Sequence, residues 1–206
     1  MFLDIGGVLL TDGWDHRARQ RAATNFQLNF AEIEDRHRLT FQPFEEGKLT
    51  LMEYLNLTIF YEERSFSADQ FREYMFEQSK PYSEMIELFS KLKINHRLKI
   101  VVVSNEAREL NSHRIHTFKL NELVDCFVSS CFVHLRKPDA DIFRLALDIS
   151  QTPSEQILFI DNTAMFVEIA AGLGMRGIQH VDYASTRAKL ASFGLSVKAG
   201  GRDEVC

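Results

Sequence analysis

The sequence has few of the residues that mark several classes of protein. Its three cysteines, Cys126, Cys131 and Cys206, give neither the even count of a disulfide framework nor a C-x-x-C pair of the kind that binds zinc. No apolar run approaches the ~18 residues of a membrane span, and no basic segment precedes the apolar stretch at the start. We therefore expect reduced, buried thiols in a cytoplasmic protein without a membrane partner.

Positive charge is also scarce. The 24 lysines and arginines are outnumbered by 29 aspartates and glutamates, which gives a net charge of −5, and no long basic run is present. Nucleic acids and anionic membrane surfaces are bound by basic patches. The sequence thus predicts no nucleic-acid partner, and any phosphorylated ligand must be held by a local site.

Apolar content is what the chain has in abundance. Of 206 residues, 45% are hydrophobic and 26% are charged. This balance is typical of soluble globular proteins and excludes wholesale disorder. The length suits one domain, or one domain that carries an insertion.

Short apolar runs alternate with helical patterns through most of the chain. Runs with the character of buried strands lie at 1–5, 98–105, 125–130, 157–162 and 176–181. Helical spacing follows at 106–119, 138–149 and 163–173. This alternation predicts an α/β fold in which helices cover both faces of a parallel sheet.

Residues 12–85 interrupt the alternation. They contain no convincing strand and predict four helices, at 15–27, 29–40, 50–62 and 67–79. Asp15 and Ser67 are the expected N-caps, and Pro43 with Gly47 is expected to break the middle of the region. We predict a helical bundle inserted at 12–85, a core formed by 1–11 and 86–198, and a flexible tail at 199–206.

Polar residues stand where three of the predicted strands end, and a lysine precedes the helix that Pro138 opens. In chain order they are Asp4, Ser104, Asn105, Lys137, Asp161 and Asn162. In an open parallel sheet the ligand crevice lies beyond the carboxyl ends of the strands. Taken singly, each such residue is more often a turn or helix cap. As a set, they predict a site for an anion and a divalent cation, and oxygen ligands suit Mg²⁺.

Four ordered motifs at these positions resemble those of the haloacid dehalogenase superfamily, whose members are mostly phosphatases and phosphotransferases. The matching segments are DIGGVLL (4–10), VVVSN (101–105), RKPDADIF (136–143) and FIDNTAMFVEIAAGLGMRGI (159–178). A fifth segment, FEEGKLTLMEYL (44–55), is similar to the loop and helix of the subclass with an all-helical (C1-type) cap. The resemblance implies a Rossmann-like core with an inserted helical cap.

The resemblance also implies a covalent mechanism on a small phosphorylated metabolite. Asp4 would attack phosphorus and form an aspartyl phosphate that water then hydrolyses. Mg²⁺ would be held by Asp4, the backbone carbonyl of Gly6 and Asp161, and would neutralise charge as two anions approach. Asn162 would lie beside these metal ligands without being one of them.

The remaining site residues would handle the phosphoryl group and the substrate. Ser104 and the amide of Asn105 would bind phosphoryl oxygens, while Lys137 would offset the spreading negative charge, so that Ser104 and Lys137 count as catalytic with Asp4. In the C1-type cap an acidic residue followed by glycine dips toward the crevice. Glu46 and Gly47 occupy that place, which implies a substrate contact for Glu46.

One departure from the family pattern bears directly on activity. Most phosphatases of the superfamily carry an acid two residues after the nucleophile, as general acid and base, and here that residue is Gly6. A positioned acid or base contributes about 10² to 10⁴ in rate. Another carboxylate could replace it, with Asp12, Glu46 and Glu106 as candidates, or the leaving group could need no proton.

Two further functions stay open on the sequence. The protein could be a catalytically lapsed binding or regulatory protein, for which Gly6 is the main argument. Dehalogenation of a 2-haloacid is less favoured, because that branch lacks the metal-binding aspartate that Asp161 resembles.

Smaller departures from the family pattern are Phe166 and His134, which stand where the motifs usually have asparagine and glycine. Trp14 is expected at the cap hinge or in the substrate pocket.

Overall fold

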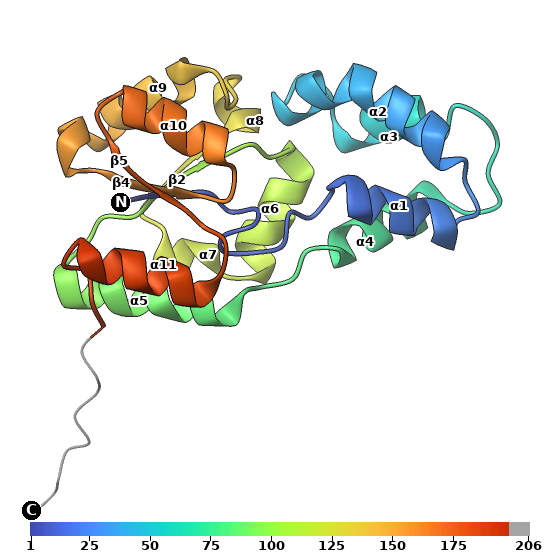
Figure 1. Cartoon of the computed structure of the whole chain (residues 1–206). Coiled ribbons are helices and arrows are strands. Elements are labelled where there is room, and N and C mark those ends of the chain that lie inside the picture. The colour runs from blue at the N-terminus through green and yellow to red at the C-terminus, as the bar shows by residue number, and fades with distance from the viewer. Residues whose placement is uncertain (198–206) are drawn as a thin grey trace, which may run out of the picture.

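The computed structural model describes residues 1–197, and its strands form one parallel sheet (Figure 1). The five strands stand in the spatial order β3-β2-β1-β4-β5. Their bounds are β1 Phe2–Leu3, β2 Val101–Ser104, β3 Cys126–Ser129, β4 Leu158–Asp161 and β5 Arg176–Gln179. The predicted α/β fold with a parallel sheet is confirmed. Residue 198 and the predicted tail 199–206, including Cys206, lie outside the described residues.

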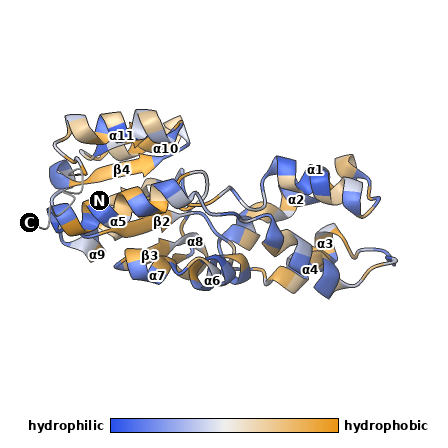
Figure 2. Cartoon of the chain, turned by 90° about the horizontal axis from the view of Figure 1, so that it is seen from below, coloured by the Kyte–Doolittle hydropathy of each residue, from blue (hydrophilic) through white to orange (hydrophobic). Residues whose placement is uncertain are grey.

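Helices cover both faces of the sheet. On one face lie α5 (Ser83–His96), α7 (Leu120–Leu123) and α11 (Tyr183–Ser192), and on the other lie α9 (Ala140–Ser150) and α10 (Ala164–Gly172). Successive strand residues point to opposite faces. Leu3 therefore packs in the apolar cluster under α5, α7 and α11, and Phe2 packs in the cluster under α9 and α10. The apolar colour of the strands in Figure 2 reflects this double burial.

The region predicted as an insertion is helical in the structure. It contains α1 (His16–Asn25), α2 (Phe30–Glu45), α3 (Leu51–Thr58) and α4 (Ala68–Glu77), which stand apart from the sheet in Figure 1. Asp15 accepts a hydrogen bond from the Ala18 amide at 2.7 Å. At the start of α4 the Ser67 side chain accepts from the Gln70 main-chain amide, and the Gln70 side chain accepts from the Ser67 main-chain amide. The two predicted N-caps are confirmed.

These four helices share an apolar core of their own. Tyr54, Phe71 and Met75 are its most buried large residues, and it extends to Leu110. Leu110 belongs to α6 (Arg108–Thr117), which follows β2 in the sheet domain. The helical layer therefore packs directly on the carboxyl end of the sheet, where the polar residues of the strands lie.

The prediction that Pro43 breaks the insertion is wrong. Helix α2 continues through Pro43 and ends at Glu45, beyond the predicted end at residue 40. Pro43 cannot donate to the carbonyl of Leu39, but Leu39 is 73% exposed, so the interrupted side of the helix faces water. The break comes at Gly47, whose φ is +67° and where a Cβ atom would lie 2.2 Å from the Cys131 carbonyl oxygen.

The two connections between the helical layer and the sheet run side by side. The Thr11 amide donates to the Lys80 carbonyl and the Tyr82 amide donates to the Leu9 carbonyl, both at 2.9 Å. The Thr11 hydroxyl also donates to the carbonyl of Gln78. This pairing brings the ends of the insertion together, as expected for a cap that leaves and re-enters the core. The exact boundaries, 12 and 85, stay a prediction.

No helix within residues 1–197 combines the length and apolar character needed to cross a membrane.

Candidate active site

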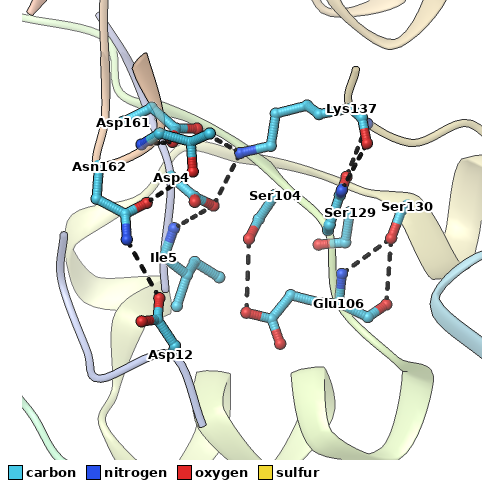
Figure 3. Close-up of polar contacts among 12 residues, drawn as sticks. Asp4, Ile5, Asp12, Ser104, Glu106, Ser129, Ser130, Lys137, Asp161 and Asn162 are labelled. Carbon is cyan, nitrogen blue, oxygen red and sulfur yellow. Dashed lines mark hydrogen bonds and ion pairs between the residues drawn. The ribbon is translucent and has the colours of Figure 1, made fainter. Parts of the chain in front are cut away.

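Strand register places two carboxylates side by side at the end of the sheet. In the pairing of β1 with β4, Leu3 lies opposite Ile160, so Asp4 and Asp161 are the next residues along. The Lys137 ammonium lies 3.1 Å from Asp4 Oδ1 and 2.6 Å from Asp161 Oδ2 (Figure 3). Three residues that the sequence predicted for the site are therefore brought into direct contact.

This cluster is buried and short of positive charge. Lys137 and Asp161 are 0% exposed and Asp4 is 8% exposed. Burial alone would lower the pKa of Lys137, but Asp4 and Asp161 outweigh it and hold that pKa above its usual value. Burial and the nearby Asp4 raise the pKa of Asp161 against the opposing effect of Lys137. One ammonium faces two carboxylates, so a further cation would be favoured here.

Asn105 fixes the position of Lys137. Its side-chain Nδ2 donates to the Lys137 carbonyl and its Oδ1 accepts from the Lys137 amide, both at 2.8 Å. The side chain of Asn105 is thus occupied by the Lys137 main chain. Ser104, at the end of β2, has its hydroxyl 3.5 Å from Glu106 Oε1.

A cavity of about 450 Å³ lies over this end of the sheet. The sheet domain contributes Asp4, Gly6, Ser104 and Asn105 to its walls, with Asn162 at the edge. The helical layer supplies the opposite wall, with Trp14, Arg19, His37, Phe44 and Glu45. The cavity therefore lies between the sheet and the helical layer, and the predicted nucleophile, Asp4, is among its lining residues.

The chemistry of the oxygen atoms at this end of the sheet suits a magnesium ion. Asp4 and Gly6 line the cavity, and Asp161 is fully buried beside Lys137. Within residues 1–197 no group of three or more acidic, histidine or cysteine side chains could hold a metal. The ion would thus need ligands from the main chain, water or substrate as well, as Mg²⁺ usually does.

Asp12 lies over the glycine that replaces the usual acid. A Cβ atom built on Gly6 would be 3.3 Å from Asp12 Oδ1 and 3.5 Å from the Asp12 Cα. Asn162 Nδ2 lies 3.3 Å from the same oxygen and donates to it (Figure 3). Burial raises the pKa of Asp12, and the Asp15 and Asp4 carboxylates raise it further. A side chain at position 6 would extend into the space that the Asp12 carboxylate occupies.

Comparison with known families agrees with this fold. A family model described as haloacid dehalogenase-like hydrolase matches residues 1–174. The chain belongs to the haloacid dehalogenase-like (HAD-like) hydrolase family. A comparison with curated proteins gives no match.

Solved structures similar to this HAD-like chain include a HAD family enzyme of Bacteroides thetaiotaomicron in complex with magnesium and inorganic phosphate. The identity is 20%, the TM-score is 0.73, and the match covers 90% of this chain and 96% of that one. A predicted HAD-like family hydrolase of Porphyromonas gingivalis is 18% identical with a TM-score of 0.72, and the match covers 92% of this chain and 96% of that one. An L-2-haloacid dehalogenase of Xanthobacter autotrophicus with covalently bound chloropropionic acid is 15% identical with a TM-score of 0.60, and the match covers 95% of this chain and 83% of that one. At these identities the likeness shows the shared fold.

Glu46 does not line the cavity of this HAD-like protein. Its two carboxylate oxygens accept hydrogen bonds from Gln42 at 3.0 Å and Lys48 at 2.6 Å. The neighbouring Glu45 lines the cavity instead and accepts from Arg136 Nη2 at 2.7 Å. Because α2 ends here, adjacent side chains point in different directions, and the sequence alone did not separate them. The structure thus gives no support to a substrate contact by Glu46.

Glu106, another candidate for the missing acid, is committed to a buried ion pair. Its carboxylate lies beside Arg114 Nη1, and these side chains are 3% and 1% exposed. Burial raises the pKa of Glu106 to about 7 against the opposing effect of Arg114. Arg114 also donates to the carbonyl of Thr11, which lies in the connection to the cap. The pair therefore ties α6 to that connection.

We expect Glu106→Ala to destabilise the protein by about 3–5 kcal/mol, because it leaves the Arg114 guanidinium buried without a carboxylate. Urea unfolding monitored by circular dichroism measures this loss. Glu87→Ala, which breaks an exposed pair with Lys91, serves as control and should change the midpoint little. A shift no larger than that of the control would show that the buried pair contributes nothing.

The departures at Phe166 and His134, and the location expected for Trp14, each have a structural account. Phe166 lines the cavity with its ring centroid 5.0 Å from the Lys137 ammonium. His134 has a φ of +56°, a left-handed conformation that explains why glycine is usual there, and its Nδ1 is hydrogen-bonded to the Glu46 carbonyl at 2.6 Å. Trp14 lines the cavity and is 8% exposed, so it both packs and faces the pocket.

Several cavity residues were not singled out from the sequence, among them His37, Glu45 and Arg136. Arg136 directly precedes Lys137 and Glu45 directly precedes Glu46, so their place beside predicted site residues was the available signal. His37 carries no such signal, because only the packing of α2 brings it to the cavity.

Proposed function

We propose that the protein is a Mg²⁺-dependent phosphomonoester hydrolase or phosphotransferase that acts on a small phosphorylated metabolite through an aspartyl phosphate. The contact of Asp4 and Asp161 with one Lys137 ammonium at the carboxyl end of the sheet carries this proposal. The magnesium and phosphate complex of the structurally similar B. thetaiotaomicron enzyme supports it.

In the first half-reaction, an oxygen of Asp4 forms a bond to phosphorus while the bond from phosphorus to the leaving-group oxygen breaks. Lys137 stabilises the negative charge that spreads over the phosphoryl oxygens, and Ser104 with the main-chain amide of Asn105 donates to them. Asp4, the Gly6 carbonyl and Asp161 would hold Mg²⁺, which supplies charge neutralisation between nucleophile and phosphoryl group.

Asp12 serves as the general acid and base, a role that position 6, a glycine here, usually fills. It protonates the leaving-group oxygen in the first half-reaction. In the second, water attacks phosphorus, Asp12 accepts a proton from that water, and the bond to Asp4 breaks to release inorganic phosphate. In a phosphotransferase an alcohol replaces the water. The hydrogen bond from Asn162 holds the Asp12 carboxylate in this place.

The position of Asp12 also weighs against a lapsed, non-catalytic protein. Loss of catalysis would leave empty space over Gly6, whereas a carboxylate of raised pKa occupies it. Such a group can hold a proton nearer to neutral pH than an exposed aspartate can.

Removal of magnesium tests the proposed function. Wild-type protein should release phosphate from members of a metabolite panel and from acetyl phosphate, lose that activity in excess EDTA, and regain it when Mg²⁺ is restored, because Lys137 alone leaves one carboxylate uncompensated. Inorganic phosphate is measured colorimetrically.

Two other results would replace the proposal. Release of chloride from 2-chloropropionate in EDTA would favour a dehalogenase. Failure to release phosphate, together with failure to form a beryllofluoride adduct, would favour a binding protein.

A further inference from the structure

The cap wall of the cavity contains a hydrogen-bonded chain of three side chains. Trp14 Nε1 donates to the hydroxyl of Tyr54 at 2.9 Å, and that hydroxyl lies 2.9 Å from His37 Nδ1. Tyr54 is 1% exposed, while Trp14 and His37 line the cavity. We propose that His37 directs an N–H donor at the substrate and selects phosphomonoesters whose leaving group is uncharged and bears a hydroxyl or carbonyl oxygen. This inference rests on the proposed function.

We assign the tautomer of His37 from this chain. An indole N–H can only donate, so the Tyr54 oxygen accepts from Trp14. The single hydroxyl proton of Tyr54 is then available for His37 Nδ1, and we assign it there. In neutral imidazole the other nitrogen carries the proton. Nε2 of His37 is thereby a donor, and within residues 1–197 it has no hydrogen-bond partner of its own.

His37 is neutral in this setting. Burial lowers its pKa to about 4, and the nearby Arg19 adds to this, against the opposing effect of Glu34. A neutral N–H donor matches an oxygen acceptor and does not attract an anion as a cation would. It also disfavours a cationic group, which has no acceptor to offer.

The two arginines that line the cavity, Arg19 and Arg136, are already paired. Arg19 donates through Nε and Nη2 to Glu34, and through Nη1 to the Trp14 carbonyl. Arg136 donates through Nε and Nη2 to Glu45. Neither guanidinium has its charge free for a second phosphate or a carboxylate on the substrate.

Apart from His16, whose Nδ1 lies 2.8 Å from Glu34 Oε2, the rest of the helical wall is apolar or acidic. Trp14 and Phe44 provide aromatic surface, and Asp15 and Glu45 provide carboxylates. A second anion on the leaving group would meet these carboxylates, and Arg136, the cation beside Glu45, is already paired with it. A hydroxylated carbon skeleton can instead pack on the rings and accept from His37. Polyol and sugar monophosphates have this chemistry.

A matched pair of substrates tests the selection. Glycerol 3-phosphate and 3-phosphoglycerate differ chiefly in a hydroxymethyl group against a carboxylate, and fructose 6-phosphate with fructose 1,6-bisphosphate forms a larger pair. In whichever pair the wild-type protein hydrolyses, we expect kcat/KM to be at least about tenfold higher for the substrate whose leaving group is uncharged. A preference for the anionic member in both pairs overturns the inference.

His37 variants separate recognition from chemistry. His37→Phe keeps a ring without the donor and should lower kcat/KM for the preferred sugar or polyol phosphate about tenfold, mainly through KM. Turnover of acetyl phosphate, whose small acyl group fills little of the cavity, should change less than about twofold. His37→Gln keeps an N–H donor and should retain more activity than His37→Phe. Equal losses on all substrates, or no loss on any, contradict the proposed role.

Long-range ¹H–¹⁵N NMR tests the tautomer independently of activity. His37 should show a protonated Nε2 and an unprotonated Nδ1 near neutral pH, and Tyr54→Phe should remove this preference. A protonated Nδ1 in the wild type overturns the inference alone. Absence of phosphate release from acetyl phosphate by the wild type would instead overturn the proposed function, and the selection with it.

Discussion

Asp4→Asn protein should release phosphate at least about 10⁴-fold more slowly than the wild type on every substrate, because an amide oxygen cannot form the covalent intermediate. The asparagine keeps the size of the side chain, so the fold should persist. Steady-state phosphate release measures the loss, and circular dichroism checks the fold.

The control for this experiment is Asp148→Asn, which alters an exposed residue of α9 far from the sheet's carboxyl end and should leave kcat unchanged. Beryllofluoride labelling provides a second measurement, since the adduct should form on wild-type protein and not on the Asp4 variant. Turnover by Asp4→Asn at the wild-type rate would eliminate Asp4 as nucleophile.

Asp12→Asn should lower kcat for alkyl phosphates by about 10² to 10⁴, the usual contribution of a positioned acid and base. The deficit in the first half-reaction should be smaller with acetyl phosphate, because its leaving group is acidic enough to depart without a proton. Comparison of kcat for the two substrate types measures this difference.

The spacing between Gly6 and Asp12 allows a rescue experiment. With Asp12→Ala the oxygen 3.3 Å from a Cβ at position 6 is removed, so Gly6→Asp has room to supply a carboxylate from the other side. The double variant should regain part of the lost kcat. Gly6→Asp alone should gain nothing, because two carboxylates then compete for one space. Full activity of Asp12→Asn on alkyl phosphates would exclude Asp12 as the acid.

The sheet and the floor of the site were predictable because both depend on short-range rules. Buried strands are apolar runs, and parallel strands bring their carboxyl ends to one edge, so the sequence was enough to place Asp4 and Asp161 together. Helix starts at Asp15 and Ser67 follow from local hydrogen bonds. The resemblance to the haloacid dehalogenase superfamily, which the family match confirms, predicted a Rossmann-like core from the order of these elements.

The walls of the cavity were not predictable in the same way. Choosing Glu45 over Glu46 requires the last residue of α2, and helix ends are uncertain by a residue or two from sequence. The presence of Asp12 over Gly6 depends on how the turn after β1 folds back toward Lys80. His37 reaches the cavity only because α2 and α3 pack against each other through Tyr54. Each is a tertiary property.

The location of Asp12 has a consequence for the timing of the reaction. It belongs to the connection that leads into the cap, beside Thr11, whereas Asp4 belongs to the sheet. In the proposed mechanism, an outward movement of the helical layer that broke the hydrogen bond from Asn162 would carry Asp12 away from Asp4. A phosphorylated Asp4 would then have no partner to deprotonate water, and it would survive until the cap returned. The lifetime of the covalent intermediate would then depend on the rate at which the helical layer closes over the sheet.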